Sequence, residues 1–409
     1  MNATQKVIAL VIFLAALALI ATSCGPQVVE KPVPVEVTRQ VEVTRVVEKL
    51  VEKQVTALPP PTVEVLSPAE TAARNLPTSF HTTTAGMGYW YAQENGGLEQ
   101  FTHIPYDQLS CKNCHVESCT SCHVGTSAAA PPQAKCVACH GRQAFEINAK
   151  NAEGQPLIAD VHRAKGMQCV NCHTAEEAHG DGKAYNSLLE TAGVECQDCH
   201  PQDKLSANPA HAQHSDDMTC QGCHVQTVVT CYNCHFDTEV AAHKKVPYKQ
   251  VTGWKLLVKR DGKIDVANMM SLVCTQNCDG RPTSFVALAP YFGHSIVKPT
   301  DLNALCAQCH DNPNVKEYLE KGTITVSQWD ATAKALKFAQ GVVPVPADFE
   351  KAFQMDFVDI VGQTEEGKPI WDFMKSGVDK FQILYAEPLD RLPPQMKFNF
   401  PTPVPTPSQ

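Results

Sequence analysis

Residues 111–123 read CKNCHVESCTSCH, two copies of the pattern Cys-x-x-Cys-His separated by three residues. The same five-residue unit occurs six more times, always before residue 311. The eight units are CKNCH (111–115), CTSCH (119–123), CVACH (136–140), CVNCH (169–173), CQDCH (196–200), CQGCH (220–224), CYNCH (231–235) and CAQCH (306–310). They contain sixteen of the 19 cysteines, and the other three are Cys24, Cys274 and Cys278.

A Cys-x-x-Cys-His unit is the attachment signature of a c-type haem. Its two thiols bond to the two vinyl groups of the haem, and its histidine ligates the iron. A single unit could also bind zinc or form a disulfide. Neither alternative explains why histidine follows all eight cysteine pairs, since only 16 of 409 residues are histidine. We therefore expect eight haem c groups as the cofactors of this chain.

The units specify which residues would hold each haem. The expected thioether cysteines are Cys111, Cys114, Cys119, Cys122, Cys136, Cys139, Cys169, Cys172, Cys196, Cys199, Cys220, Cys223, Cys231, Cys234, Cys306 and Cys309. The expected proximal iron ligands are His115, His123, His140, His173, His200, His224, His235 and His310. Eight haems within residues 111–310 must pack against one another. The short spacers after CKNCH and after CQGCH bring neighbouring haems closest, and close haem edges favour electron transfer.

Eight histidines lie outside the units, as many as the predicted irons. They are His81, His103, His162, His179, His211, His214, His243 and His294. The match predicts iron with two histidine ligands throughout, so that every haem is six-coordinate. Two alternatives stay open at each position: an ordinary surface histidine, or a methionine ligand from Met87, Met167, Met218 or Met270.

Cys274 and Cys278 lie in CTQNCDG, where the spacing is one residue longer and Asp279 replaces histidine. We expect a disulfide, because cysteines four apart on one helix face approach bridging distance. A ninth haem or a reactive thiol is the alternative.

The first residues indicate the compartment. Lys6 precedes an apolar run that ends in ATSC at Cys24, the pattern of a bacterial lipoprotein signal. We predict a signal peptide over 1–23 and lipidation at Cys24, so that the chain is exported and anchored to a bacterial membrane, facing the periplasm or the cell exterior. Ordinary secretion and an uncleaved anchor are the alternatives. The formal charge of −9 disfavours nucleic acid as a partner.

Composition divides the rest of the chain. Residues 24–75, rich in Val, Glu and Pro, are expected to form a lipid-anchored stalk, or else a short coiled coil through which the chain oligomerises. Residues 76–312 are expected to adopt a mainly irregular and helical multihaem cytochrome c fold organised around packed haems. A small insertion over about 250–293 should contain a β-hairpin at 254–269, with its turn at Asp261-Gly262, and a strand at 284–292.

The last hundred residues change character. Helical spacing at 326–340 and 346–357 predicts a helical C-terminal segment over 313–391. A Pro-rich tail follows at 392–409.

Over about half its length the sequence resembles the multihaem c-type cytochromes. In haem count and general layout it is also similar to octahaem tetrathionate reductase and octahaem hydroxylamine oxidoreductase. In the hydroxylamine family one haem keeps an open face, and in the tetrathionate reductase family the active haem has a lysine ligand. The Cys-x-x-Cys-Lys motif of pentahaem nitrite reductases is absent from this sequence.

The leading expectation is an electron carrier with no catalytic residue. Its partners would be other cytochromes or a membrane quinol-linked complex. One alternative is an oxidoreductase that reduces a nitrogen or sulfur oxyanion at one exchangeable haem. Another is a subunit of a conductive cytochrome filament.

Overall fold

The computed structural model describes residues 66–110, 114–125, 129–191, 193–205, 211, 214, 216–278 and 280–392. All of them belong to one compact region, Glu64–Gln409. The predicted signal peptide, Cys24, most of the predicted stalk, Cys111, Asp279 and residues 393–409 lie outside the described residues. Within the part that is described, no helix is both long enough and apolar enough to span a membrane.

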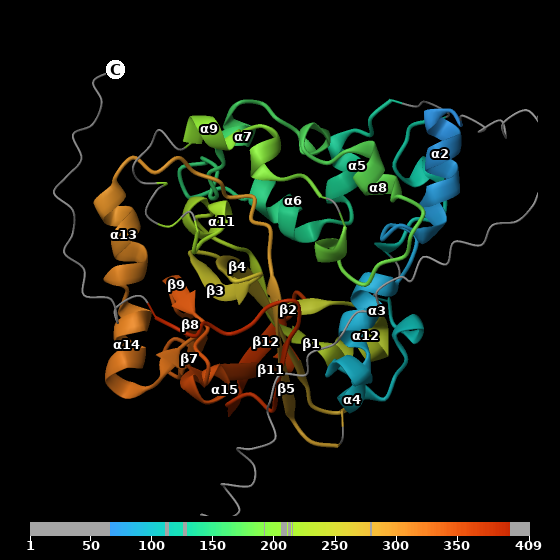
Figure 1. The fold of residues 1–409 in the computed structure, drawn as a ribbon. Helices are drawn as coiled ribbons and strands as arrows, with labels where there is room; N and C mark the ends of the chain where they lie inside the picture. The colour runs from blue at the N-terminus through green and yellow to red at the C-terminus, as the bar shows by residue number, and fades with distance from the viewer. Residues whose placement is uncertain are drawn as a thin grey trace, which may run out of the picture. The chain divides into compact units, whose positions relative to one another are not determined.

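Short helices and turns make up the described chain before residue 225 (Figure 1). The helices are α2 (Pro68–Asn75), α3 (Ala85–Tyr91), α4 (Glu99–Thr102), α5 (Gln133–Val137), α6 (Gly141–Asn148), α7 (Val161–Ala164), α8 (Ala175–His179), α9 (Gln202–Leu205) and α11 (Cys220–His224). The 3₁₀ turns are η1 (Leu76–Thr78), η2 (Gln93–Asn95), η3 (Tyr106–Gln108), η5 (Cys119–Ser121), η6 (Cys169–Asn171), η7 (Leu188–Glu190) and η8 (Cys196–Asp198).

Helix α2 corrects the predicted end of the stalk. Ser67 caps this helix by accepting a hydrogen bond from the Glu70 backbone, and the Glu70 side chain bonds back to the Ser67 backbone. At the other end, the Asn75 amide donates to the Gly180 carbonyl oxygen at 3.1 Å, just beyond α8. Residues 66–75 therefore belong to the folded region, because a capping box starts the helix and a tertiary hydrogen bond holds its end.

A seven-stranded sheet follows. Its strands are β1 (Thr230–His235), β2 (Val246–Val251), β3 (Trp254–Arg260), β4 (Lys263–Cys274), β5 (Thr283–Pro290), β9 (Gly341–Pro344) and β13 (Lys380–Ile383). The main order is β13-β5-β4-β1-β2, and β3 pairs with both β4 and β9. Helix α12 (Phe236–Ala242) connects β1 to β2.

The predicted hairpin forms, but it is not a small insertion. β3 and β4 pair antiparallel, with Arg260 opposite Lys263. Asp261 and Gly262 make the turn with φ angles of 51° and 79°, the left-handed values that a two-residue hairpin turn requires. β5 supplies the expected third strand, antiparallel to β4. The hairpin lies within the seven-stranded sheet, because β9 and β13 from the C-terminal segment pair with β3 and β5.

The C-terminal segment is mostly β structure, so the prediction of a helical segment is wrong. Two helices, α13 (Leu302–His310) and α14 (Pro313–Lys321), precede β6 (Ile324–Thr325), β7 (Ser327–Asp330), β8 (Ala335–Phe338), β9, α15 (Phe349–Ala352), β10 (Phe353–Gln354), β11 (Asp356–Gln363), β12 (Pro369–Ser376) and β13. In place of a helix over 326–340, β7 and β8 form an antiparallel hairpin.

Local turn chemistry explains this failure. The Asp330 carboxylate accepts hydrogen bonds from the backbone of Thr332 and Ala333, each at 2.9 Å, and Lys334 has a φ of 48°. A helix cannot continue through a left-handed residue. The segment predicted as a helix at 346–357 contains only the four residues of α15 before the chain becomes extended.

The sheet is covered on both faces. Leu272, Phe285 and Ala287 pack with side chains of α3 and α4. Their neighbours in sequence, such as Val273 and Val286, belong to a larger cluster that includes residues of β8 and β11. Successive side chains of a strand point to opposite faces, so the alternation assigns the N-terminal helices to one face and the C-terminal strands to the other.

Candidate functional site

Most of the Cys-x-x-Cys-His units adopt the same tight turn. In four of them the histidine N–H donates to the carbonyl oxygen of the first cysteine at 2.8–3.0 Å, in CTSCH, CVACH, CVNCH and CQDCH. CQGCH forms α11, and CAQCH ends α13. Residues three and four apart are neighbours on a helical turn. Each of these six units can therefore present two sulfur atoms and one imidazole to the same ligand.

The structure places six unit histidines opposite histidines from outside the units. Ring centroids in these pairs are 6.0–6.2 Å apart. The pairs are His81–His140, His123–His179, His162–His200, His173–His294, His211–His224 and His214–His310. Every one combines one predicted proximal residue with one predicted distal residue.

The nearly constant distance between the ring centroids has a physical explanation. A metal–imidazole bond is about 2.0–2.1 Å long, so a metal midway between two imidazoles separates the ring centroids by about 6 Å. The angle between the ring planes varies from 9° to 73° while the distance stays almost fixed. A linear ligand–metal–ligand axis gives this behaviour, because it fixes the distance and allows each ring to rotate.

These pairs do not fit zinc. Throughout the described ranges, no group of three or more His, Cys, Asp or Glu side chains could hold a metal ion. Structural zinc takes four protein ligands. Each pair could offer a metal two nitrogen ligands, so any further ligands would come from outside the described side chains. A haem c group, if bound, would supply them, and the adjacent cysteines would be its attachment residues.

Hydrogen bonds at Nδ1 leave Nε2 available for the metal. The Nδ1–H group donates to a backbone carbonyl oxygen in four of the paired histidines: His81 to Ala178 (2.9 Å), His123 to Ala129 (3.0 Å), His211 to Leu205 (2.9 Å) and His224 to Val297 (2.9 Å). A proton on Nδ1 places the lone pair on Nε2, and such bonds orient metal-ligating imidazoles.

The His173–His294 pair has carboxylates on both sides. The Glu177 carboxylate accepts from Nδ1 of His173 at 2.8 Å and raises the pKa of that histidine. Glu146 lies 3.5 Å from Nδ1 of His294. Burial lowers the pKa of His294 to about 4, so this imidazole is neutral at neutral pH. Burial also raises the pKa of Glu146 to about 7, against the opposing charge of Arg163.

Cysteines of successive units lie beside one another. The thiols of Cys136 and Cys169 are in hydrogen-bonding contact, which joins CVACH to CVNCH. Cys139 contacts Cys114 in the same way, which joins CVACH to CKNCH. Cys122 of CTSCH is also close enough to raise the pKa of Cys139.

The series continues toward the C-terminus. Burial raises the pKa of Cys172, and Cys199 raises it further, so CVNCH adjoins CQDCH. Cys196 of CQDCH contacts Cys220 of CQGCH, and this contact lowers the pKa of Cys220 to about 6.

The last link joins CQGCH to CAQCH. Burial raises the pKa of Cys309 to about 11, and Cys223 adds to that increase. These contacts follow the order CKNCH and CTSCH, CVACH, CVNCH, CQDCH, CQGCH, CAQCH.

Four described histidines stand outside the six pairs: His103, His115, His235 and His243. The chain just before CKNCH is tied to α12, because the Ser110 N–H donates to the Glu239 carboxylate at 2.8 Å. Helix α12 ends at His243, which is its C-cap. Burial lowers the pKa of His115, and Lys245 contributes to the decrease. These contacts place the α12 C-terminus beside CKNCH and make His243 the candidate partner of His115.

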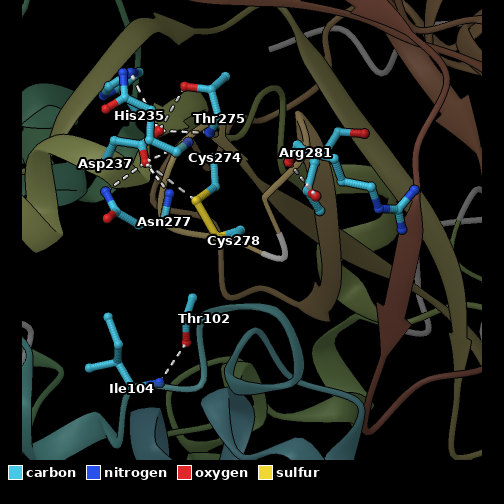
Figure 2. The surroundings of a disulfide bond; sticks show 12 residues. Thr102, Ile104, His235, Asp237, Cys274, Thr275, Asn277, Cys278 and Arg281 are labelled. Atoms are coloured by element: carbon cyan, nitrogen blue, oxygen red, sulfur yellow. Dashed lines mark hydrogen bonds and ion pairs between the residues drawn. A yellow bond between two sulfur atoms is a disulfide. The ribbon is translucent and has the colours of Figure 1, made fainter.

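Cys274 and Cys278 are joined by a disulfide, with their Cα atoms 5.8 Å apart. The bridge is at the end of β4 and not on a helix, contrary to the geometry assumed from the spacing. Figure 2 shows the loop wrapped around Asp237, whose carboxylate accepts from the backbone N–H groups of Thr275, Gln276 and Asn277. Burial acts to raise the pKa of Asp237, but these donors outweigh it and lower the pKa.

Sequence reasoning missed the carboxylates at the candidate haem ligands. Glu177 was detectable in principle, since it lies four residues after His173 and shares its face of a helical turn. Glu146 gave no such signal, because it is far from His294 in sequence and meets it only in the fold.

No protein-family model, curated protein or solved structure matches this chain. Its own residues are therefore the basis for assigning a function.

Proposed function

We propose that this chain is an exported multihaem c-type cytochrome that carries electrons along a row of haems. The observation that supports this most strongly is the set of six histidine pairs, each joining a Cys-x-x-Cys-His unit to an outside histidine across about 6 Å. The distance fits iron with two axial imidazoles, and each unit histidine has two cysteines beside it in sequence, as the attachment motif requires.

Haem iron, when bound, supplies a one-electron couple. The protein's contribution is to hold each iron between two imidazoles, to orient those rings through Nδ1, and to set each potential through hydrogen bonding and burial. Carbonyl acceptors leave the ligand imidazole close to neutral, whereas the carboxylate of Glu177 gives it more negative character. We therefore expect the CVNCH haem to have a lower reduction potential than its neighbours.

The order of the units supports conduction. Thioether sulfurs mark the haem edges, so contacts such as Cys136–Cys169 and Cys196–Cys220 bring the edges of successive haems together. Electrons would enter at one end, near CKNCH and CTSCH, or at the other end, CAQCH, and pass through the haems between them. The partners at the two ends would be other redox proteins, and the predicted lipid at Cys24 would hold the row at a membrane.

The pairs favour a carrier over a reductase. An iron that already has two imidazole ligands has no vacant position for an oxyanion, and at least six of the predicted irons fall in this class. The filament alternative has no separate support in the described contacts.

The mass and the spectrum of the purified protein test this proposal. We expect at least six haems per chain, a low-spin spectrum when oxidised, and no change of the reduced spectrum on adding carbon monoxide. A chain that carries zinc or no haem would overturn the cofactor assignment. A haem that is high-spin in the wild type, or that binds carbon monoxide, would move the assignment to the reductase.

A further inference from the structure

A lysine is buried within the sheet. Lys255 lies on β3 between Trp254 and Leu256, and its exposed fraction is 2%. Its Nζ donates to the carbonyl oxygens of Gly222 and Val225, each at 2.7 Å. A buried charge without hydrogen-bond partners strongly destabilises a fold, so these two acceptors make a lysine tolerable at this position.

Both acceptors belong to the C-terminal end of α11, the helix that CQGCH forms. The last carbonyl groups of a helix have no partner within it, and a lysine near that end can donate to them. Burial lowers the pKa of Lys255. The two short hydrogen bonds oppose this effect, because they stabilise the ammonium form. The acceptors are backbone groups, so they would remain after a haem had attached to the cysteines of α11.

The strand places Lys255 between two of the units. β3 pairs with β4 on one side and with β9 on the other, where Lys255 is opposite Val342. Helix α11 packs on β4, and helix α13, which ends in CAQCH, packs on β9. The lysine therefore lies between the helices that carry CQGCH and CAQCH.

The charge of Lys255 acts on one cysteine in each of these units. Burial raises the pKa of Cys223 and of Cys309, and Lys255 opposes the increase at both. Further effects on these two thiols come from other cysteines, Cys220 and Cys306. A thioether carries no charge, whereas the ammonium group keeps its own. In the proposed haem protein, Lys255 would therefore be a cation beside an attachment residue of each unit.

The role of this lysine is electrostatic, because both irons would already have two ligands. His224 of CQGCH faces His211, with ring centroids 6.1 Å apart. His310 of CAQCH faces His214, with ring centroids 6.2 Å apart. An ammonium group also has no lone pair to offer a metal.

We propose that Lys255 raises the reduction potentials of the haems on CQGCH and CAQCH, so that electrons entering near CKNCH and CTSCH are drawn toward CAQCH. This inference rests on the proposed function, since it presupposes haem at these units. Each ferric iron takes one electron from the neighbouring haem and loses one positive charge. A fixed cation nearby favours the reduced form, and burial strengthens the effect because little water screens it.

Lys255→Met in the full-length holoprotein tests the effect of the charge. Methionine keeps an unbranched side chain and removes the ammonium group. In a spectroelectrochemical titration we expect two haems to be reduced at lower potentials than in the wild type, and the others to be unchanged. Lys259→Met is the matched control, because Lys259 lies on the same strand, is partly exposed and pairs with Asp390 at 3.0 Å. An absence of any shift in Lys255→Met, or an equal shift of every haem, would overturn the inference.

A second variant separates the charge from the cap of α11. Lys255→Gln keeps an N–H donor for the carbonyl groups and should lower the same two potentials. The CAQCH haem can be followed alone in a His214→Ala background, because the loss of the ligand opposite His310 makes its iron high-spin. Loss of the CQGCH haem from both variants by intact mass, or an unshifted CAQCH potential, would make Lys255 a helix cap only and overturn the inference. A wild-type protein without haem would overturn the proposed function instead, so the two failures are distinguishable.

Discussion

Replacing His162 with alanine should convert one haem and leave the others unchanged. His162 lies on α7 and faces His200, the proximal histidine of CQDCH, with ring centroids 6.2 Å apart. The cap of α7 does not use the imidazole, because Asp160 accepts from the backbone N–H groups of residues 162 and 163 at 2.9 Å. Alanine also favours a helix. The side chain is 38% exposed, so the loss of folding free energy should be about 1 kcal/mol or less.

The magnitude follows from the ligand count. The CQDCH iron keeps His200 and loses the ligand opposite, so carbon monoxide binding should rise from zero to one molecule per chain. The other five pairs remain intact. Added imidazole should enter the space left by the side chain and restore the low-spin spectrum. We expect half-saturation near 1 mM, about 4 kcal/mol of binding free energy, because the free ligand is not held in place by the chain.

The assay is a titration of the reduced variant with carbon monoxide, followed by imidazole. The wild-type protein, titrated in the same way, is the control. A variant that binds no carbon monoxide, or one in which two or more haems become high-spin, would refute the pairing of His162 with the CQDCH iron.

Two further predictions concern single sites. His243→Ala should create one high-spin haem at CKNCH in a spectrum of the oxidised protein, because α12 brings His243 beside that unit; a high-spin haem in His103→Ala instead would reassign the ligand. Glu146 should make the reduction potential of the CVNCH haem depend on pH. Burial raises the pKa of Glu146 to about 7, so this carboxyl group ionises as the pH rises through neutrality. Its negative charge, 3.5 Å from His294, then stabilises the oxidised iron. Potentiometry should show the potential falling between about pH 6 and 8, by at most about 59 mV per unit, and Glu146→Gln should abolish the slope; an equal slope in both proteins would contradict this.

The sequence was most informative where chemistry is repeated. Eight units and eight outside histidines predicted two-histidine ligation, and six of the outside histidines do lie opposite unit histidines. The sequence could not predict which outside histidine pairs with which unit histidine. His294 and His173 are neighbours only because β5 and the chain after it return to the region of α6 and α8. Partner choice is a property of the fold and has no local pattern.

The sheet region shows where local sequence patterns fail to predict secondary structure. Residues 326–340 have apolar positions at helical spacing, yet the Asp330 turn and the left-handed Lys334 divide them into two strands. The CYNCH unit is a second place where the local sequence does not predict the local structure. Its sequence fits the motif of the other units, but its backbone pairs with β2 and β4 and does not form the turn that the motif forms elsewhere.

Burial separates the two halves of the folded region. Among the apolar side chains described between residues 114 and 224, only Ile158 is buried, whereas the strands from β1 to β11 share a continuous apolar core that includes Trp254 and Phe357. A segment with so little apolar burial cannot offset the entropy of ordering its loops. Haems held at six pairs would supply the missing core as well as the redox centres. The sheet needs no such help, because its apolar side chains already pack into a core of their own.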